Sequence, residues 1–213
     1  MLKLVIFDLD QTLINTLPRF HRIFNKSLEH FGGKPIDWDT FIKDYADDIL
    51  NRHVPVEPRI FWDYFLSHYN DIECKRDEPI EGALDVLKFL KDRGIKVVIT
   101  TGRMVPSSEV WKELERFGMD KYVDLVYTRL NNYGDGRRRT ELIREAMKRF
   151  NVSKDETMLV ADYWPDMQSG REAGVLTVGV LTGLEGEKKL REHGADAVIE
   201  SVRDLPKLLD DLI

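Results

Sequence analysis

Residues 4–13 read LVIFDLDQTL, a short apolar run that ends in two aspartates, Asp8 and Asp10. The run is typical of a buried parallel strand, because a strand covered on both faces is continuously apolar. Side chains two residues apart in an extended chain lie on the same side, so the two carboxylates should be close together. Such a pair is costly unless a positive charge lies between them, and a divalent cation with oxygen ligands, best Mg²⁺, would supply it. A surface Asp-Leu-Asp turn is the alternative that this stretch alone leaves open.

Other short apolar runs alternate with amphipathic patterns of helical period. The runs predict further strands at residues 96–100, 125–127, 157–161, 176–180 and, at an edge, 197–199. The patterns predict helices at 82–93, at 107–117 with Ser107 or Ser108 as the N-cap, and at 140–150. Alternating strands and helices indicate an α/β fold with a doubly wound parallel sheet, in which chemistry gathers at the carboxyl ends of the strands.

One segment interrupts this alternation. Residues 17–76 contain no evident strand, and their patterns predict helices at 18–31, 40–52 and 58–69. We therefore expect a core made of residues 1–16 and 77–213, with an inserted all-helical domain at 17–76. The aromatic residues of the insert are expected to form its packed interior.

The composition limits the kinds of partner that the chain can have. Charged residues make up 33% of the sequence, the formal net charge is −6, and Lys and Arg are scattered. This argues against a nucleic-acid-binding stripe or a membrane-surface helix, so we expect neither nucleic acid nor membrane as a partner. Cys74 is the only cysteine, and the apolar N-terminus reads as a strand rather than a signal peptide. We expect a cytoplasmic protein and, by default, a monomer.

A second apolar run, residues 157–161, also ends in an aspartate. Asp162 follows this run, and Asp166 stands four residues later. In a doubly wound sheet Asp162 would lie at the same edge as Asp8, where it could complete a metal site with Asp166 beside it. The alternative for Asp166 is a simple cap on the helix that follows the strand.

Two further elements carry groups that bind phosphate. Thr100 ends the run at 96–100, and the backbone N–H groups that follow it could donate to a phosphate oxygen. Three arginines, Arg137, Arg138 and Arg139, precede the helix expected at 140–150. One of them could neutralise a phosphate and balance the acidic cluster, while a solvated basic turn explains at least two of the three.

Taken together and in this order, these elements resemble the haloacid dehalogenase-like (HAD) phosphatase superfamily. The resemblance is to its phosphoglycolate-phosphatase-like branch, in which a helical cap follows the first strand. Residues Asp8 to Leu13 are similar to the Asp-x-Asp-x-Thr motif, and Thr100 is similar to the hydroxyl motif. Asp162 and Asp166 are similar to the paired-acid motif. The fold implied is a Rossmann-like core with an inserted helical cap that closes over it and excludes water.

The resemblance also implies a two-step mechanism. Asp8 would attack phosphorus and form an aspartyl phosphate, and Asp10 would protonate the leaving oxygen and then activate water. Thr100 would bind a phosphate oxygen. The implied Mg²⁺ ligands are Asp8, the backbone carbonyl of Asp10, Asp162 and, in the first or second coordination shell, Asp166.

This sequence departs from the family pattern at several positions. Gln11 stands where the family usually has glycine, and Tyr163, followed by Trp164, stands where a small residue often follows Asp162. The family's cation is usually lysine, and the best alignment puts Arg137 there, or Arg138 if the register is off by one. Arginine keeps the charge but has a different reach.

The expected function is Mg²⁺-dependent hydrolysis of a phosphomonoester in a small phosphorylated metabolite. Asp10 argues against a dehalogenase, because only an oxygen leaving group needs an acid. A sugar phosphomutase of the same family stays open, with His21 or Arg19 as the groups that would favour transfer to sugar. A catalytically degenerate phosphate-binding or interaction protein is the alternative from another class.

Overall fold

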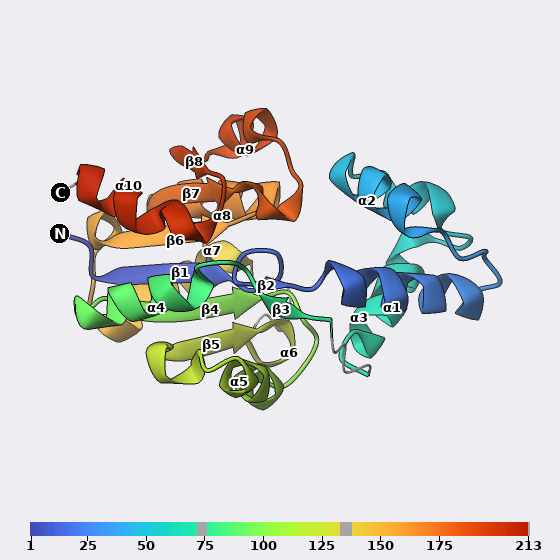
Figure 1. Ribbon diagram of the computed structural model, residues 1–213, viewed down its shortest axis with the longest axis horizontal. Coiled ribbons are helices and arrows are strands. Elements are labelled where there is room, and N and C mark those ends of the chain that lie inside the picture. Colours follow the sequence, from blue (N-terminus) through green and yellow to red (C-terminus); the bar gives the residue numbers. More distant parts are fainter. Residues whose placement is uncertain (72–75, 133–137, 213) are drawn as a thin grey trace. The chain divides into compact units, whose positions relative to one another are not determined.

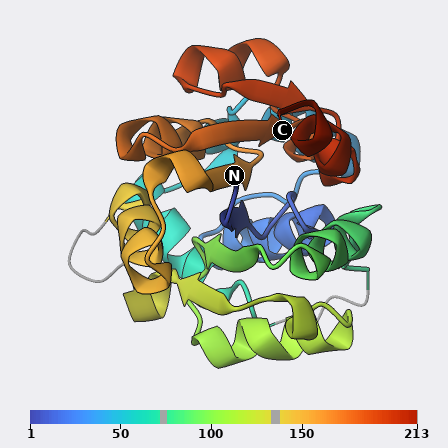
Figure 2. The same cartoon turned by 90° about the vertical axis from the view of Figure 1, so that its left-hand side faces the viewer.

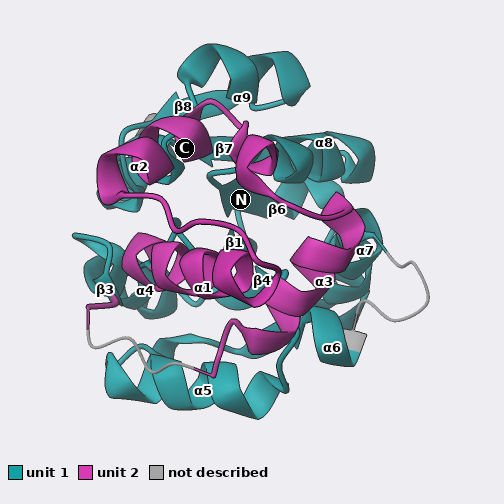
Figure 3. Cartoon of the chain, turned by 90° about the vertical axis from the view of Figure 1, so that its right-hand side faces the viewer, with its two compact units in different colours: residues 1–15, 78–213 teal, residues 16–77 magenta. Residues whose placement is uncertain are grey.

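The computed structural model describes residues 1–71, 76–132 and 138–212. The chain divides into two compact units (Figure 3). Unit 1 consists of Met1–Asn15 and Glu78–Ile213, and unit 2 consists of Thr16–Asp77. The roles of catalytic core and cap, which the sequence analysis assigned to 1–16 with 77–213 and to 17–76, stay predictions.

Within the described residues, unit 1 is built on a six-stranded parallel sheet in the order β5-β4-β1-β6-β7-β8. The strands are β1 (Leu4–Asp8), β4 (Lys96–Thr101), β5 (Leu125–Thr128), β6 (Thr157–Ala161), β7 (Leu176–Val180) and β8 (Ala197–Ile199). The chain moves outward from β1 in both directions, so β1 lies at the point where the strand order reverses. The predicted fold class, a doubly wound parallel α/β sheet, is confirmed.

Helices cover both faces of this sheet (Figures 1 and 2). They are α4 (Ala83–Asp92), α5 (Ser107–Arg116), α6 (Arg129–Asn132), α7 (Arg139–Phe150), α8 (Trp164–Ala173), α9 (Glu187–His193) and α10 (Leu205–Leu212). Val5 and Phe7 of β1 pack in the core that α4, α5 and α10 line, whereas Leu4 and Ile6 pack against α7. Because strand side chains alternate between faces, Asp8 continues the row of Leu4 and Ile6 on the α7 face.

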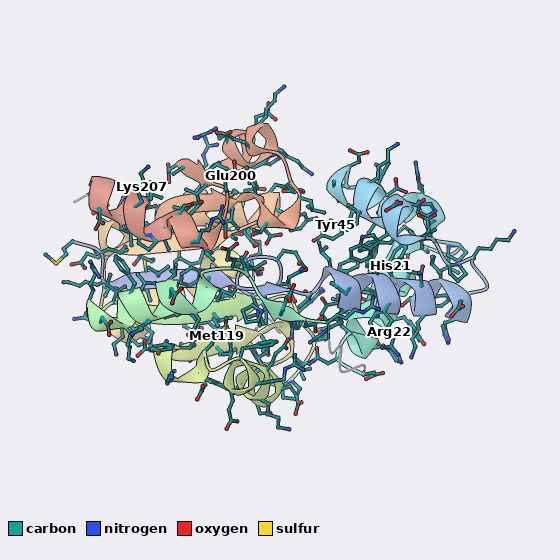
Figure 4. The ribbon with its side chains drawn as sticks, viewed as in Figure 1. His21, Arg22, Tyr45, Met119, Glu200 and Lys207 are labelled. Carbon is teal, nitrogen blue, oxygen red and sulfur yellow. The ribbon has the colours of Figure 1, made fainter. Side chains whose placement is uncertain are left out.

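Among its described residues, 16–71 and 76–77, unit 2 contains helices joined by turns and loops and no strand. It contains α1 (Leu17–His30), α2 (Trp38–Ala46), the 3-10 helix η1 (Leu50–His53) and α3 (Pro58–His68). Phe20 lies at the centre of its aromatic interior, with ring centroids of Phe65 and Tyr45 at 4.6 and 5.3 Å. His21 of α1 and Tyr45 of α2 extend from these helices in Figure 4.

The chain passes between the units twice, near residues 15–16 and 77–78, and the two segments contact each other. In unit 1, β2 (Ile14–Asn15) pairs antiparallel with β3 (Glu78–Pro79). In unit 2, the buried Arg19 guanidinium forms an ion pair with Asp77, and Arg19 Nε donates to Asp77 Oδ2 at 2.6 Å.

Two sequence-based details are wrong. The helix expected at 40–52 is divided into α2 and η1, because Asp48 adopts a left-handed backbone conformation (φ 57°) that ends the first segment. The N-cap of α5 is Pro106 rather than Ser107 or Ser108, and its side chain makes no capping bond. Proline fits there because its fixed φ suits a helix start.

Among the described residues, no helix is both long enough and apolar enough to cross a membrane.

Candidate active site

Asp8 is the last residue of β1 and lies at the carboxyl edge of the sheet. It is buried and pairs in register with Thr100 of β4. Burial raises the pKa of Asp8 to about 7; the Arg139 guanidinium counteracts this effect, and the charges of Asp166 and Asp10 add to it. The charged form of a buried carboxylate costs free energy, because it has lost its hydration. A cation beside Asp8 would offset that cost.

Arg139, the first residue of α7, is the cation that contacts this carboxylate. Its Nη1 lies 2.9 Å from Asp8 Oδ1 and 2.9 Å from Asp166 Oδ2. Arg137, which the sequence analysis selected, lies outside the described residues. Arg138 is exposed, and its Nη1 lies 3.7 Å from Glu172 Oε2.

A pattern in the sequence could have identified Arg139. Positions 139, 142, 143 and 146 lie on one helical face, and Leu142, Ile143 and Ala146 form the buried stripe of α7. Arg139 extends this buried stripe by one turn toward the carboxyl edge of the sheet, whereas Arg138 lies to one side of the stripe. The position of each arginine around the helix axis therefore distinguishes Arg139 from Arg138.

Asp162 and Asp166 are brought to the same edge. Asp162 directly follows β6 and is buried, and its Oδ1 accepts a hydrogen bond from Thr12 Oγ1 at 3.1 Å. Burial and the charges of Asp8 and Asp166 raise the pKa of Asp162 well above its usual value. Burial also raises the pKa of Asp166, with Arg139 acting against it and Glu185 adding to it.

Asp166 does not cap the helix that contains it. The N-cap of α8 is Tyr163, without a side-chain capping bond, and the Asp166 carboxylate instead pairs with Arg139. The capping alternative raised from the sequence is therefore wrong for this residue.

Mg²⁺ fits the chemistry of these donors. Asp8 and Asp162 are buried oxygen donors whose pKa values are raised mainly by burial, so a cation beside them would stabilise their charged forms. Gly183 leaves room for one of them, since a Cβ at this position would lie 1.8 Å from Asp162 Oδ2. In the described parts of the chain, no group of three or more histidine, cysteine, aspartate or glutamate side chains is arranged so that it could hold a metal ion.

The Asp10 side chain makes different contacts from Asp8. Arg103 donates to it side-on, with Nε 2.9 Å from Oδ2 and Nη2 2.7 Å from Oδ1. Thr101 Oγ1 lies 3.4 Å from Asp10 Oδ2. Arg103 also pairs with Glu113 of α5. No role for Arg103 could be predicted from the sequence, because nothing in its local pattern predicts a contact across 93 positions.

Thr100 lies beside Asp8 on the neighbouring strand and is fully buried. Its Oγ1 is 3.5 Å from the Phe7 carbonyl oxygen, so the hydroxyl is directed back toward β1. The structure therefore brings Asp8, Thr100, Asp162 and Asp166 to one edge of the sheet, with Arg139 among them.

Gln11 has the backbone conformation that suits glycine. Its φ is 61°, in the left-handed region, and its side chain is buried. Thr182 Oγ1 donates to the Gln11 carbonyl oxygen at 2.5 Å, which ties the loop after β7 to the loop after β1. This hydrogen bond helps to hold the left-handed backbone at Gln11, directly after the two aspartates.

Comparisons with known proteins agree with this geometry. A family model described as haloacid dehalogenase-like hydrolase matches residues 5–180. The pyrophosphatase PpaX from Halalkalibacterium halodurans is 30% identical over 204 residues, which cover 94% of each chain.

Solved structures share the fold. A predicted phosphatase from Clostridium acetobutylicum matches with a TM-score of 0.80 and 21% identity, over 99% of both chains. A predicted phosphoglycolate phosphatase from Haemophilus somnus matches with a TM-score of 0.76 and 19% identity, over 98% of both chains. The family model covers most of this sequence, and a relative at 30% identity covers nearly all of it. The chain therefore belongs to the haloacid dehalogenase-like hydrolases and, as its sequence predicted, is a phosphatase of that family.

Proposed function

We propose that this protein hydrolyses a phosphomonoester of a small metabolite, with Mg²⁺ bound and with an aspartyl phosphate formed on Asp8. The observation that carries the proposal is the environment of Asp8. Its buried carboxylate ends the central strand, contacts Arg139, and shares its edge of the sheet with Asp162 and Asp166. Such a carboxylate is available for nucleophilic attack once its charge is compensated.

In this proposal, Asp8, Asp10 and Thr100 each have a separate role in the reaction. Asp8 attacks phosphorus, the bond to the leaving oxygen breaks, and Asp10 delivers a proton to that oxygen. Asp10 then takes a proton from the water that attacks the phosphorus of the aspartyl phosphate, which restores Asp8. Thr100 donates to a phosphate oxygen.

Charge compensation comes from two sources. Arg139, rather than Arg137, is the described arginine whose contact with Asp8 supports the role of the family's cation. Asp8, the Asp10 backbone carbonyl and Asp162 would hold Mg²⁺, with Asp166 beside them. When bound, Mg²⁺ supplies electrostatic stabilisation of the phosphoryl group and shields Asp8 from an anionic substrate.

The substrate class stays a proposal. Small phosphate esters follow from the family resemblance and the helical insert. Inorganic pyrophosphate is a second candidate, because relatives at 26% and 30% identity are named pyrophosphatases. A panel should therefore contain pyrophosphate, phosphoglycolate, a sugar phosphate and a nucleoside monophosphate. The cytoplasmic location and the monomeric state expected from the sequence also remain proposals.

Contacts within unit 2 disfavour the phosphomutase alternative. Arg19 is buried in its ion pair with Asp77. His21 Nε2 lies 2.8 Å from the Ile36 carbonyl oxygen. Both side chains that the sequence analysis considered for sugar transfer therefore have structural partners in their own unit.

The direct test uses purified protein, an aryl phosphate and the substrate panel, with Mg²⁺ or with EDTA. We expect phosphate release that needs Mg²⁺ and that Asp8→Asn abolishes. Asp92→Asn, at an exposed position in α4, is the matched control and should keep wild-type activity. Equal activity of Asp8→Asn and wild type would remove Asp8 from the mechanism.

A further inference from the structure

Arg103 is among the largest fully buried side chains of the described chain, with 2% of its surface exposed. Its guanidinium has two carboxylate partners. One edge, Nε and Nη2, donates to Asp10, and Nη1 pairs with Glu113 of α5. These two carboxylates compensate the charge of the buried arginine, and Glu113 Oε1 also lies 4.0 Å from Arg116 Nη2.

The contact with Asp10 has an orienting geometry. Two N–H···O bonds to different oxygens, 2.9 Å from Nε to Oδ2 and 2.7 Å from Nη2 to Oδ1, fix the plane of the carboxylate as well as its position. A lysine ammonium could supply the charge, but it has no fork to define that plane.

Arg103 is itself held from several sides. Its backbone N–H donates to Thr101 Oγ1 at 3.3 Å, and its carbonyl accepts from the Arg129 N–H at 3.0 Å. Glu113, whose side chain is almost fully buried, holds the end of the guanidinium opposite Asp10. The Asp10 side chain is less enclosed, with 25% of its surface exposed. Arg103 and Glu113 are therefore the more deeply buried members of the network, and Asp10 is the member that reaches solvent.

We propose that Arg103, anchored by Glu113, is a positioning residue that holds the Asp10 carboxylate in one orientation for proton transfer. This inference rests on the proposed acid/base role of Asp10. Misplacement of a reacting group by about 1 Å can cost roughly 10²-fold in rate. The loss should be greatest where proton transfer matters most, which is with a poor leaving group.

The experiment measures kcat/KM for two esters, an alkyl phosphate and a dinitrophenyl phosphate. This parameter reports the steps up to release of the leaving group, and the dinitrophenolate departs without needing a proton. For Arg103→Lys we expect a loss of roughly 10–10²-fold with the alkyl ester and of less than about 3-fold with the dinitrophenyl ester. Arg203→Lys, which changes an exposed arginine paired with Glu81, is the matched control and should change neither value.

Glu113→Gln provides a second variant that keeps the guanidinium and a hydrogen-bond acceptor. Glu113→Gln should also lose more kcat/KM with the alkyl ester than with the dinitrophenyl ester, by a smaller factor than Arg103→Lys. If Arg103→Lys does not fold, Glu113→Gln is the variant that tests the proposal. Circular dichroism and melting temperature establish folding for each variant. Equal losses with both esters in folded variants, or no loss with either, would overturn the positioning role.

Asp10→Asn separates this proposal from the one on which it rests. If Asp10→Asn itself shows no leaving-group selectivity, the acid/base assignment of Asp10 fails. If Asp10→Asn is selective and the folded Arg103 and Glu113 variants are not, only the inference about Arg103 fails.

Discussion

Replacement of Gly183 by alanine tests whether Asp162 holds the metal ion. Gly183 closes the 3-10 helix η5 (Leu181–Gly183) after β7, and its backbone is outside the left-handed region. An added Cβ therefore causes little backbone strain. It would instead meet the Asp162 side chain, 1.8 Å from Oδ2 and 2.5 Å from both Cβ and Cγ.

The size of the effect follows from these distances. Real Cβ atoms essentially never approach a neighbour closer than 3.0 Å, so Oδ2 and the new methyl group must separate by about 1.2 Å. Metal–oxygen distances tolerate only about 0.2 Å, so a shift of this size removes Asp162 as a well-placed ligand. Disturbing the support of a ligand costs about 10–100-fold in metal affinity, or roughly 1.4–2.8 kcal/mol.

The assay is calorimetric titration of metal-free protein with Mg²⁺, together with the rise in melting temperature that Mg²⁺ produces. Gly186→Ala is the matched control, because nothing lies within 4 Å of a Cβ there and φ is −72°. Asp162→Asn marks the loss expected when the ligand itself changes. A folded Gly183→Ala protein that binds Mg²⁺ as tightly as Gly186→Ala would refute this placement of the metal site.

Three further perturbations test other parts of the account. Arg139→Met should lower kcat/KM for an aryl phosphate by about 10²–10³-fold, and Arg139→Lys by less, because only the lysine keeps a charge near Asp8; equal losses would contradict an electrostatic role. The pKa of Asp8 is about 7 in the folded chain and 3.8 without the fold, so its contribution to stability is present at acid pH and is lost as pH rises through about 7. The melting temperature of metal-free protein should therefore fall between about pH 4 and pH 7 and level off above that range, and Mg²⁺ should raise it more at the higher pH; the reverse trend would contradict the cost of burying a charged Asp8. Arg19→Met leaves Asp77 buried without its cation and should lower the free energy of unfolding by about 3–5 kcal/mol in urea titrations, whereas the exposed Arg22→Met should change it by less than about 0.5 kcal/mol.

The strands of the six-stranded sheet could be predicted from sequence almost residue by residue, whereas the two-residue strands β2 and β3 were not predicted. The strands β6, β7 and β8 begin and end where the apolar runs do, and β1, β4 and β5 extend one residue further. Such runs are informative because both faces of the sheet are covered, as the packing of Val5 and Ile6 against opposite layers shows. Parallel alignment then brings the residues that follow different strands to one edge.

The partners of the site side chains were harder to predict. Arg139 reaches Asp8 across 131 positions, and Arg103 reaches Asp10 across 93. Periodicity reports which face of an element is buried, but not which charged group that face meets. Arg139 could still have been found from the phase of α7, since it continues the buried stripe. Arg103 could not, because no apolar period includes the turn after β4.

Chemical identification of the phosphorylated residue tests the central claim most directly. Protein mixed with an aryl phosphate and Mg²⁺ should be quenched in acid during turnover and mapped by mass spectrometry of its peptides. The account predicts one added phosphoryl group on Asp8 that disappears when hydroxylamine cleaves the acyl phosphate and does not form in Asp8→Asn or without Mg²⁺. A phosphoryl group on another residue, or turnover by Asp8→Asn at the wild-type rate, would contradict it.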